Sequence, residues 1–172
     1  MELTYGRYLK VEELLQLQQP LSEGPEHDEM LFIIIHQVYE LWFKQILHEL
    51  EKLKSSFQEG ERGKALHTLK RIRSILKVLV SQVDVLETMT PLEFLSFRER
   101  LQSASGFQSC QFRELEFTLG LKNPKHLEHY PQGSEERIRL EKKMEEPSLW
   151  EVFLQFLSSL GHDSPKLKKA KD

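Results

Sequence analysis

The dominant hydrophobic pattern of the chain lies in residues 27–53, HDEMLFIIIHQVYELWFKQILHELEKL. Apolar side chains recur there every three or four positions, which is the spacing of one face of an α-helix. This first face carries Leu31, Ile34, Ile35, Val38, Leu41, Trp42, Ile46 and Leu50. A second, adjoining face carries Phe32, His36, Tyr39 and Phe43. A helix with two apolar faces is expected to be buried on both, so this segment is predicted to be the central helix.

A second long helix is predicted over residues 65–86, where apolar residues again keep the helical spacing. Only the short turn QEGERG separates it from the first, so the two long helices should pack antiparallel. Its basic residues are interpreted as a solvated face. Thr90 with Glu93 and Ser148 with Glu151 form capping-box sequences that start two shorter helices.

Further short helices are expected in residues 11–17, 110–119 and 135–146, separated by loops at 21–26, 102–109 and 121–134. No segment of useful length alternates apolar and polar residues with the period of a strand. The fold class is therefore predicted to be all-α, a helical bundle with two long antiparallel helices and shorter flanking helices. Residues 1–161 are expected to form a single helical domain, followed by a basic, flexible tail at 162–172.

Composition and charge narrow the class of protein. The chain has 172 residues, enough for one domain with a real core, and its formal net charge of −3 gives no electrostatic case for nucleic acid. The single cysteine, Cys110, cannot form an intrachain disulfide, which fits a reducing compartment. The longest apolar run, residues 30–35, is far short of the roughly 20 residues that span a bilayer, and residues 1–10 lack a signal-peptide core. We expect a cytoplasmic protein with no nucleic-acid or membrane partner.

His36 is the first candidate for chemistry, because it lies in the apolar second face of the central helix, one turn after Phe32. One interpretation is a core histidine that is hydrogen-bonded to a neighbour. The other is a base or hydrogen-bond donor in an apolar pocket, since burial disfavours the charged imidazolium and leaves a neutral ring that can act near pH 7. The pattern leaves both interpretations open.

Arg98 is the second candidate, since it follows Phe94 by one helical turn and shares its face. It is either a surface side chain that covers aromatic residues or a fork for a ligand carboxylate, whose two oxygens match guanidinium geometry. The small residues around Gly106 could bring backbone close to a ligand. Tyr5 and Tyr8 are either packing residues or an arm that docks on a partner subunit.

Missing motifs exclude several chemistries. The chain has no glycine-rich phosphate loop, no GxSxG sequence and no HExxH sequence. None of the seven histidines has a glutamate three residues before it, so the Glu-x-x-His pairs of a di-iron bundle are absent. A single cysteine cannot build a multi-thiolate zinc site. These observations assign no metal ligand.

Four stretches together resemble the tryptophan 2,3-dioxygenase family. They are LTYGRYL at residues 3–9; HDEMLFIIIHQ at 27–37, continuing through ELWFK and HEL; the pair Phe97 and Arg98; and SGFQS at 105–109, followed by QFR. The resemblance implies a helical, usually homotetrameric haem enzyme of tryptophan catabolism, in the kynurenine pathway. Such enzymes insert both atoms of dioxygen across the indole C2–C3 bond of L-tryptophan, giving N-formylkynurenine.

The resemblance also implies roles for the candidate residues on the central helix and after Thr90. His36 resembles the histidine that hydrogen-bonds the indole N–H, and Phe32 resembles the aromatic residue that packs on the indole. Arg98 resembles the arginine that holds the substrate carboxylate. Phe94 stands where some members have a tyrosine that also touches this carboxylate, so that hydroxyl is absent here.

The same resemblance implies a role for two further segments. Tyr5 and Tyr8 resemble tyrosines that reach into the pocket of a neighbouring subunit, so a homo-oligomer is expected. Ser105 and Gly106 resemble the loop that lines the distal face of the haem.

One departure from the family pattern concerns the haem ligand. Family members continue into a C-terminal segment that carries the proximal haem histidine and a glycine-rich loop over the substrate. This sequence diverges from the family pattern after Leu160, and His162 lies in a polar stretch. Whether His48, His67 or His162 acts as the axial ligand stays open, so the metal ligand is not assigned.

Two functions remain in competition at this point. The first is a haem-dependent tryptophan 2,3-dioxygenase, an oxidoreductase that is truncated or split, with a second chain supplying the missing half and no activity expected from this chain alone. The alternative is a non-catalytic module derived from the family, which binds tryptophan or another indole or serves as a helical oligomerisation module.

Overall fold

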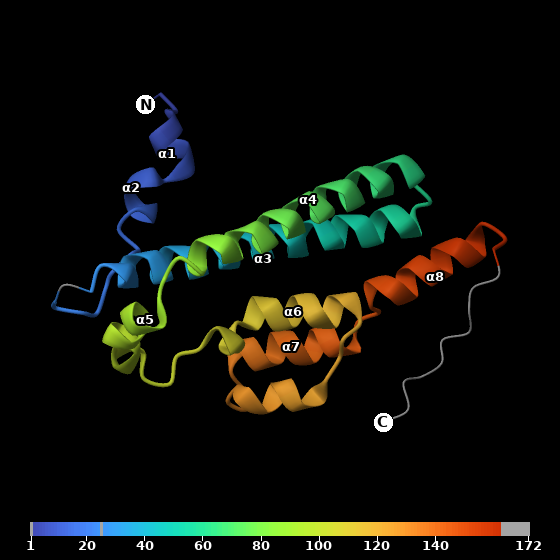
Figure 1. Cartoon of the computed structure of the whole chain (residues 1–172). Coiled ribbons are helices and arrows are strands. Elements are labelled where there is room, and N and C mark those ends of the chain that lie inside the picture. The colour runs from blue at the N-terminus through green and yellow to red at the C-terminus, as the bar shows by residue number, and fades with distance from the viewer. Residues whose placement is uncertain (1, 25, 163–172) are drawn as a thin grey trace. The chain divides into compact units, whose positions relative to one another are not determined.

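The computed structural model describes residues 2–24 and 26–162, and every regular element in that part of the chain is a helix. The all-α fold class predicted from the sequence is therefore confirmed. In chain order the α-helices are α1 (Tyr5–Leu9), α2 (Val11–Leu14), α3 (Asp28–Gln58), α4 (Arg62–Leu86), α5 (Pro91–Arg98), α6 (Cys110–Leu119), α7 (Glu135–Glu145) and α8 (Leu149–Ser159) (Figure 1). The 3-10 helices of the same part are η1 (Glu99–Leu101), η2 (Gly106–Gln108) and η3 (Pro124–His129). No helix among the described residues is long and apolar enough to cross a membrane.

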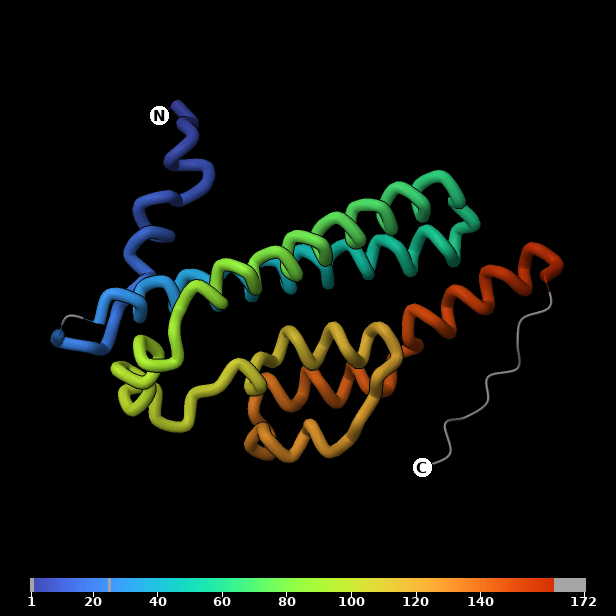
Figure 2. Tube along the Cα trace, in the orientation of Figure 1, coloured from blue at the N-terminus to red at the C-terminus, as the bar shows by residue number. Residues whose placement is uncertain are grey.

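The two long helices run side by side in opposite directions, as predicted (Figure 2). α3 extends to Gln58, beyond the predicted end at residue 53, and α4 begins after a short turn at Arg62. Arg71 of α4 donates to both carboxylate oxygens of Glu49 on α3, at 2.9 and 3.2 Å. An ion pair therefore adds to the apolar packing that holds the two helices together.

The chain divides into two compact units, and both long helices contribute to each. Unit 1 comprises residues 1–39 and 80–106, and unit 2 comprises residues 40–79 and 107–172. The single domain expected over residues 1–161 stays a prediction. The expected basic tail lies, from position 163 onward, outside the described residues.

The core of unit 2 is built from the helical stripes that the spacing predicted. On α3 it buries Ile46, Leu50, Leu53 and Phe57. The other helices of the unit add Ala65, Ile72, Ile75, Leu79, Leu115, Phe117, Leu140, Val152, Leu154 and Phe156. Burying one large apolar side chain stabilises a fold by about 1.5–3 kcal/mol, so unit 2 has a substantial core of its own.

One segment of unit 2 differs from its prediction. Residues 121–134 are predicted as a loop, but the structure forms η3 within them. Pro124 suits the first helical position, and the side chain of Asn123 accepts a hydrogen bond from the Lys125 amide at 3.1 Å. Tyr130, just after η3, is buried in a cluster with side chains of α6 and α7. This capping and this anchor let a proline-containing segment become helical.

Unit 1 is organised around the first turns of α3. The carboxylate of Glu29 accepts hydrogen bonds from the backbone amides of Leu21, at 2.7 Å, and Ser22, at 2.9 Å. Further along α3, the side-chain amide of Gln37 donates to the Leu17 carbonyl at 3.0 Å. These bonds attach the segment that carries α1 and α2 to α3.

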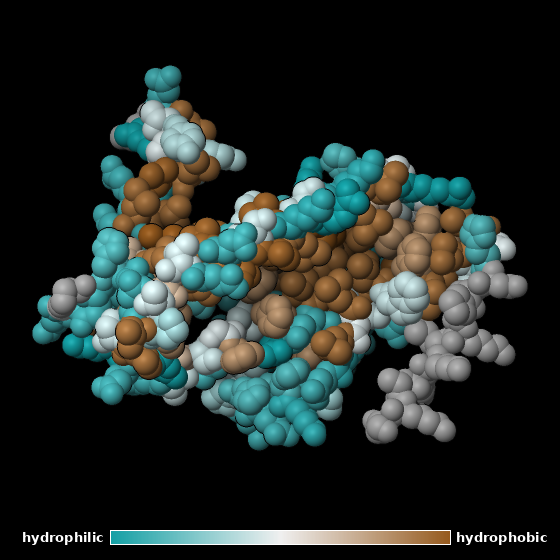
Figure 3. Space-filling model, viewed as in Figure 1, coloured by the Kyte–Doolittle hydropathy of each residue, from teal (hydrophilic) through white to brown (hydrophobic). Residues whose placement is uncertain are grey.

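Apolar side chains also lie on the surface of the long helices (Figure 3). The exposed ones include Ile34 and Leu41 on α3 and Leu66, Leu76 and Val80 on α4. Ile34 and Leu41 belong to the first apolar face of α3, for which the sequence predicts burial. That face is therefore buried only in part within this chain.

Candidate functional site

Three phenylalanine rings form an aromatic cluster in unit 1. Phe32 lies on α3, and Phe94 and Phe97 lie on α5. The centroid of the Phe32 ring is 5.7 Å from that of Phe94 and 5.6 Å from that of Phe97, and the two α5 rings are 5.5 Å apart. Phe97 is fully buried, whereas Phe32 and Phe94 are half-buried. The cluster therefore has a buried base and a partly open aromatic wall.

His36 stands against this wall, one turn after Phe32. The two ring centroids are 4.1 Å apart, and Nδ1 of His36 is 2.8 Å from the backbone carbonyl of Phe32. A carbonyl only accepts, so Nδ1 carries the proton of this hydrogen bond and Nε2 of the neutral ring is left as an acceptor. The bond fixes the tautomer and orientation of a half-buried imidazole, which suits it to accept a proton or an N–H bond from a ligand.

The backbone around Gly106 passes beside the free nitrogen of His36. A Cβ atom placed on Gly106 would lie 3.7 Å from Nε2 and 3.8 Å from Cδ2 of that ring. Gly106 begins η2 and follows Ser105, and both residues are exposed. The sequence predicts that this loop comes close to the ligand site, and the geometry brings Gly106 to the imidazole.

Arg98 ends α5, one turn after Phe94, and is half-buried. A cation in the last turn of a helix is favoured by the helix dipole. Its Nη1 donates to the backbone carbonyl of Gln102 at 3.0 Å. The other guanidinium donors meet no hydrogen-bond acceptor among the described residues. Arg98 therefore carries a charged group with unused donors on the helix that supplies the aromatic wall.

Tyr5 and Tyr8 are not brought to the cluster. Both lie on α1 and are largely exposed, at 78% and 72% of their surface. α1 lies well apart from α5, which carries Phe94 and Arg98 (Figure 1). The structure therefore assembles Phe32, Phe94, His36 and Gly106 but leaves the two tyrosines free on the surface of this chain.

Glu29 is a site residue of unit 1 that the sequence interpretation missed. Its side chain is 1% exposed. Burial raises the pKa of its carboxyl, but hydrogen bonds from Ser22 and from the Leu21 amide outweigh burial and hold the pKa below its ordinary value. The signal was an acidic residue in the first turn of a helix, directly after a polar loop. Glu29 holds the loop before α3 and so supports the helix that carries His36.

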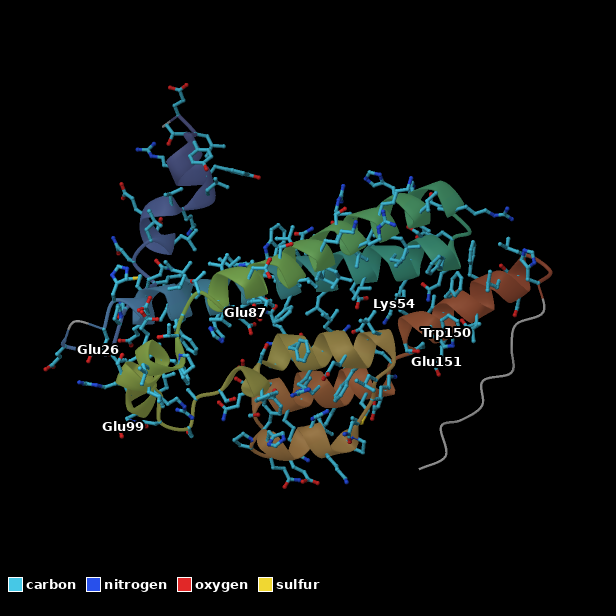
Figure 4. The ribbon with its side chains drawn as sticks, viewed as in Figure 1. Glu26, Lys54, Glu87, Glu99, Trp150 and Glu151 are labelled. Atoms are coloured by element: carbon cyan, nitrogen blue, oxygen red, sulfur yellow. The ribbon has the colours of Figure 1, made fainter. Side chains whose placement is uncertain are left out.

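Unit 2 has a hollow of a different kind. An apolar cavity of about 230 Å³ is lined by Phe57, Leu69, Leu119, Leu149, Trp150 and Phe153. Figure 4 labels Trp150 and also Lys54, a lysine of α3 whose side chain is buried. Burial lowers the pKa of the Lys54 ammonium. None of the residues that the sequence singled out for ligand binding lies in this cavity.

No metal centre is formed within the described part of the chain. No group of three or more histidine, cysteine, aspartate or glutamate side chains there could hold a metal ion. The three histidines left open as axial ligands, His48, His67 and His162, are all exposed. His67 lies 3.1 Å from a guanidinium nitrogen of Arg71. The geometry singles out none of these three as a haem ligand.

Comparison with known proteins places this geometry in a family. The chain matches the family model "Tryptophan 2,3-dioxygenase" over residues 1–169. It is 55% identical over 170 residues to the tryptophan 2,3-dioxygenase of Herpetosiphon aurantiacus, covering 99% of this chain and 65% of that protein. The protein of the same name from Anaeromyxobacter sp. (strain K) is 53% identical over 168 residues, with 98% and 63% covered. That of Xanthomonas oryzae pv. oryzae is 46% identical over 170 residues, with 99% and 57% covered.

The chain thus spans about six-tenths of the length of these relatives. The match takes in both units and every stretch that carries a candidate residue, including those of α1, α3 and α5. It also continues to residue 169, so the predicted divergence from the family pattern after Leu160 is wrong. The chain therefore belongs to the tryptophan 2,3-dioxygenase family.

Proposed function

We propose that unit 1 is the substrate-binding part of a tryptophan 2,3-dioxygenase, which acts on L-tryptophan and dioxygen and yields N-formylkynurenine. The observation that carries this proposal is the orientation of His36. Its Nδ1 is held by the Phe32 carbonyl, its ring lies against the Phe32 ring, and its Nε2 faces Gly106. A fixed acceptor on an aromatic wall suits a flat, apolar ligand with one N–H group, as an indole is.

In this proposal each side chain has one task. The indole ring packs on Phe32 and Phe94, which are half-buried and so offer an open aromatic surface. Nε2 of His36 accepts the hydrogen bond of the indole N–H and orients the ring. Arg98 pairs with the substrate carboxylate through the donors that the Gln102 carbonyl does not use. Phe94 has no hydroxyl, so Arg98 holds the carboxylate without help from that position.

Haem is the cofactor that this proposal requires, and its iron would supply the binding and activation of dioxygen. The described residues fit one face of it. Gly106, which follows Ser105, leaves the space beside Nε2 of His36 without a side chain, which permits close approach of a large planar group. The geometry singles out no described histidine as the axial ligand, and we infer that this ligand comes from the part of the family length that this chain does not span.

Oligomerisation completes the proposal. Tyr5 and Tyr8 are exposed on a short helix, although tyrosine usually buries its ring when a partner is available. We infer that α1 inserts these side chains into the site of a second copy in a homo-oligomer. Sedimentation of the chain, compared with a variant lacking residues 2–10, tests this: a shift of the variant to monomer supports the arm, and an unchanged mass argues against it.

The function is tested by reconstitution with haemin. The purified chain is mixed with haemin and L-tryptophan, with and without a second polypeptide that carries the remaining part of the Herpetosiphon aurantiacus relative. We expect a Soret band and N-formylkynurenine, followed by absorbance, only when both polypeptides are present. Product formation by this chain alone would overturn the inference of a missing axial ligand. No product from either mixture would overturn the proposed activity.

A non-catalytic tryptophan-binding module is the second candidate, because the aromatic wall, Nε2 of His36 and Arg98 all belong to residues of this chain. Calorimetry with L-tryptophan on the chain alone tests it. Weak binding that Arg98→Ala abolishes supports the module, with Arg100→Ala as the control, since Arg100 is an exposed arginine two residues further on. If the wild type does not bind L-tryptophan and both variants give the same result, the chain is not a tryptophan-binding module.

A further inference from the structure

Gln102 has a backbone conformation that residues other than glycine rarely adopt. Its φ is 49° and its ψ is −119°. The Ala104 amide donates to the Leu101 carbonyl at 2.8 Å and closes a turn across Gln102. These angles are those of the first central position of a type II′ turn, where glycine is preferred because it has no Cβ. A glutamine at this position is strained.

The side chain of Gln102 does not explain this strain. It is exposed, so neither burial nor packing imposes the conformation. The backbone groups are the parts of the residue that are engaged: the amide donates to the Glu99 carbonyl at 3.2 Å, and the carbonyl accepts from Nη1 of Arg98 at 3.0 Å. The strained conformation therefore serves to aim a carbonyl oxygen at the guanidinium.

That hydrogen bond restricts Arg98. An arginine side chain has many rotamers and loses much conformational entropy when a ligand orders it. A guanidinium is also planar, so holding Nη1 in place restricts the orientations of the plane and of its other N–H groups. The segment that follows Gln102 runs on to Gly106, beside Nε2 of His36. One short segment thus contacts the guanidinium at Gln102 and passes beside the imidazole at Gly106.

We propose that Gln102 is a positioning residue for Arg98: the type II′ turn at Gln102 presents its carbonyl to Nη1 and so orients the guanidinium for a carboxylate ligand. The orientation of Arg98 follows from the contacts within this chain. Only the identity of the carboxylate, that of an amino acid such as L-tryptophan, rests on the proposed function.

The accessibility of Arg98 to phenylglyoxal tests the positioning role without any ligand. The label on the peptide containing Arg98 is followed by mass spectrometry in the full chain. Gln102→Val disfavours a positive φ, because valine is β-branched, and should withdraw the carbonyl. We expect labelling about fivefold faster, the factor that corresponds to one ordinary hydrogen bond. Gln102→Gly keeps the turn and the carbonyl, so its labelling rate should equal that of the wild type.

Lys10 offers a matched control, since it also has a positive φ, of 50°, but does not contact Arg98. Lys10→Val should leave the labelling of Arg98 unchanged. If Gln102→Val labels at the wild-type rate, or if Gln102→Gly accelerates labelling as strongly as valine does, the proposal is overturned. Far-UV circular dichroism checks folding, and Gln102→Ala, a milder change against positive φ, replaces the valine variant in the same comparison if that variant is unfolded.

Addition of L-tryptophan separates this proposal from the proposed function. We expect L-tryptophan to protect Arg98 from phenylglyoxal in the wild type and in Gln102→Gly, and to protect it about fivefold less effectively in Gln102→Val. If the wild type is not protected, the carboxylate assignment and the proposed function fail. The difference between the valine and glycine variants without L-tryptophan would still decide whether Gln102 positions Arg98.

Discussion

In unit 2, α3 buries Ile46, Leu50, Leu53 and Phe57 almost completely, whereas the same helix in unit 1 leaves apolar side chains in the open. Ile34 is 42% exposed, although its neighbour Ile35 is buried. The apolar spacing is the same in both parts of the helix. Leu41, on the same face at the start of unit 2, is 53% exposed, so the neighbouring helices of unit 2 cover this face only beyond that residue, and unit 1 leaves Ile34 uncovered.

The two units also treat buried carboxylates differently. In unit 2, Glu114 of α6 is buried and accepts two hydrogen bonds from Arg139 of α7, at 2.8 and 3.0 Å. In unit 1, the buried carboxylate of Glu29 is held mainly by the loop before α3. The bidentate ion pair of Glu114 joins two helices of the core of unit 2. The bonds of Glu29 to backbone amides instead fix the loop before α3, the helix that carries Phe32 and His36 in unit 1.

The sharpest test of this comparison removes one buried ring from unit 1. Phe97→Ala should lower the free energy of unfolding by about 3–5 kcal/mol, because it empties the base of the aromatic cluster. Both tryptophans, Trp42 and Trp150, lie in unit 2, so their fluorescence reports that unit alone. We expect the urea transition to shift more by far-UV circular dichroism than by fluorescence.

Two variants complete this test. Leu95→Ala changes an exposed residue of the same helix and should alter stability by less than about 0.5 kcal/mol. Leu50→Ala, in the core of unit 2, should cost about 2–5 kcal/mol in both signals. Equal shifts of both signals in Phe97→Ala would show that the two units unfold as one and do not differ in stability.

A smaller effect is expected from the buried carboxylate of unit 1. Glu29→Gln should lower the free energy of unfolding by about 1–3 kcal/mol near neutral pH, because it removes hydrogen bonds to a charged acceptor. The pKa of Glu29 is below its ordinary value in the folded state, so this contribution is present above the unfolded pKa and is lost as pH falls through the folded one. Urea denaturation at pH values between about 7 and about 2 should show that the difference in the free energy of unfolding between wild type and variant decreases as the pH falls.

The control for this pH dependence is Glu99→Gln, which changes an exposed glutamate of the same unit. It should leave both the stability and its pH profile close to those of the wild type. A gap for Glu29→Gln that stays constant down to the lowest pH would mean that the charge of this carboxylate does not stabilise unit 1.

The smallest effects are expected from the two capping boxes, one in each unit. Thr90 accepts from the Glu93 amide at 3.3 Å, and Ser148 accepts from the Glu151 amide at 3.2 Å. Ser148 is buried and Thr90 is not, so Ser148→Ala should cost about 1–2 kcal/mol and Thr90→Ala about 0.5–1 kcal/mol. Thermal unfolding measures both losses of stability.

Ser74→Ala, in the middle of α4, is the control and should leave the stability unchanged or raise it slightly. A larger loss of stability for Thr90→Ala than for Ser148→Ala would contradict the predicted order.

Much of the fold follows from short-range patterns in the chain. The Thr90 and Ser148 capping boxes form as predicted, and α6 ends at Leu119, followed by Gly120, which has a positive φ of 116°. Such signals depend on residues within about one helical turn, so they can be read without the tertiary structure. The 3-10 helix η3 was not predicted, because segment 121–134 has two prolines, which favour a loop, and because its anchor, Tyr130, is buried by helices elsewhere in the chain.

The candidate site follows from the pattern only in part. His36, Phe32 and Arg98 could be named from helical spacing and from the resemblance of their segments to a family. The bond from His36 Nδ1 to the Phe32 carbonyl and the position of Gly106 beside Nε2 could not. Neither could the strain at Gln102, because glutamine carries no signal for a positive φ.

Residue order therefore accounts for the helices, their caps and the apolar faces of α3, because these depend on neighbours along the chain. Packing accounts for which parts of those faces are covered, for the contact of α5 with Phe32 and for the position of Gly106 beside the imidazole of His36. The physical reason is distance along the chain. The ring centroids of Phe32 and Phe94 are 5.7 Å apart, although the two residues belong to different helices. Contacts of this kind depend on how helices pack rather than on local spacing.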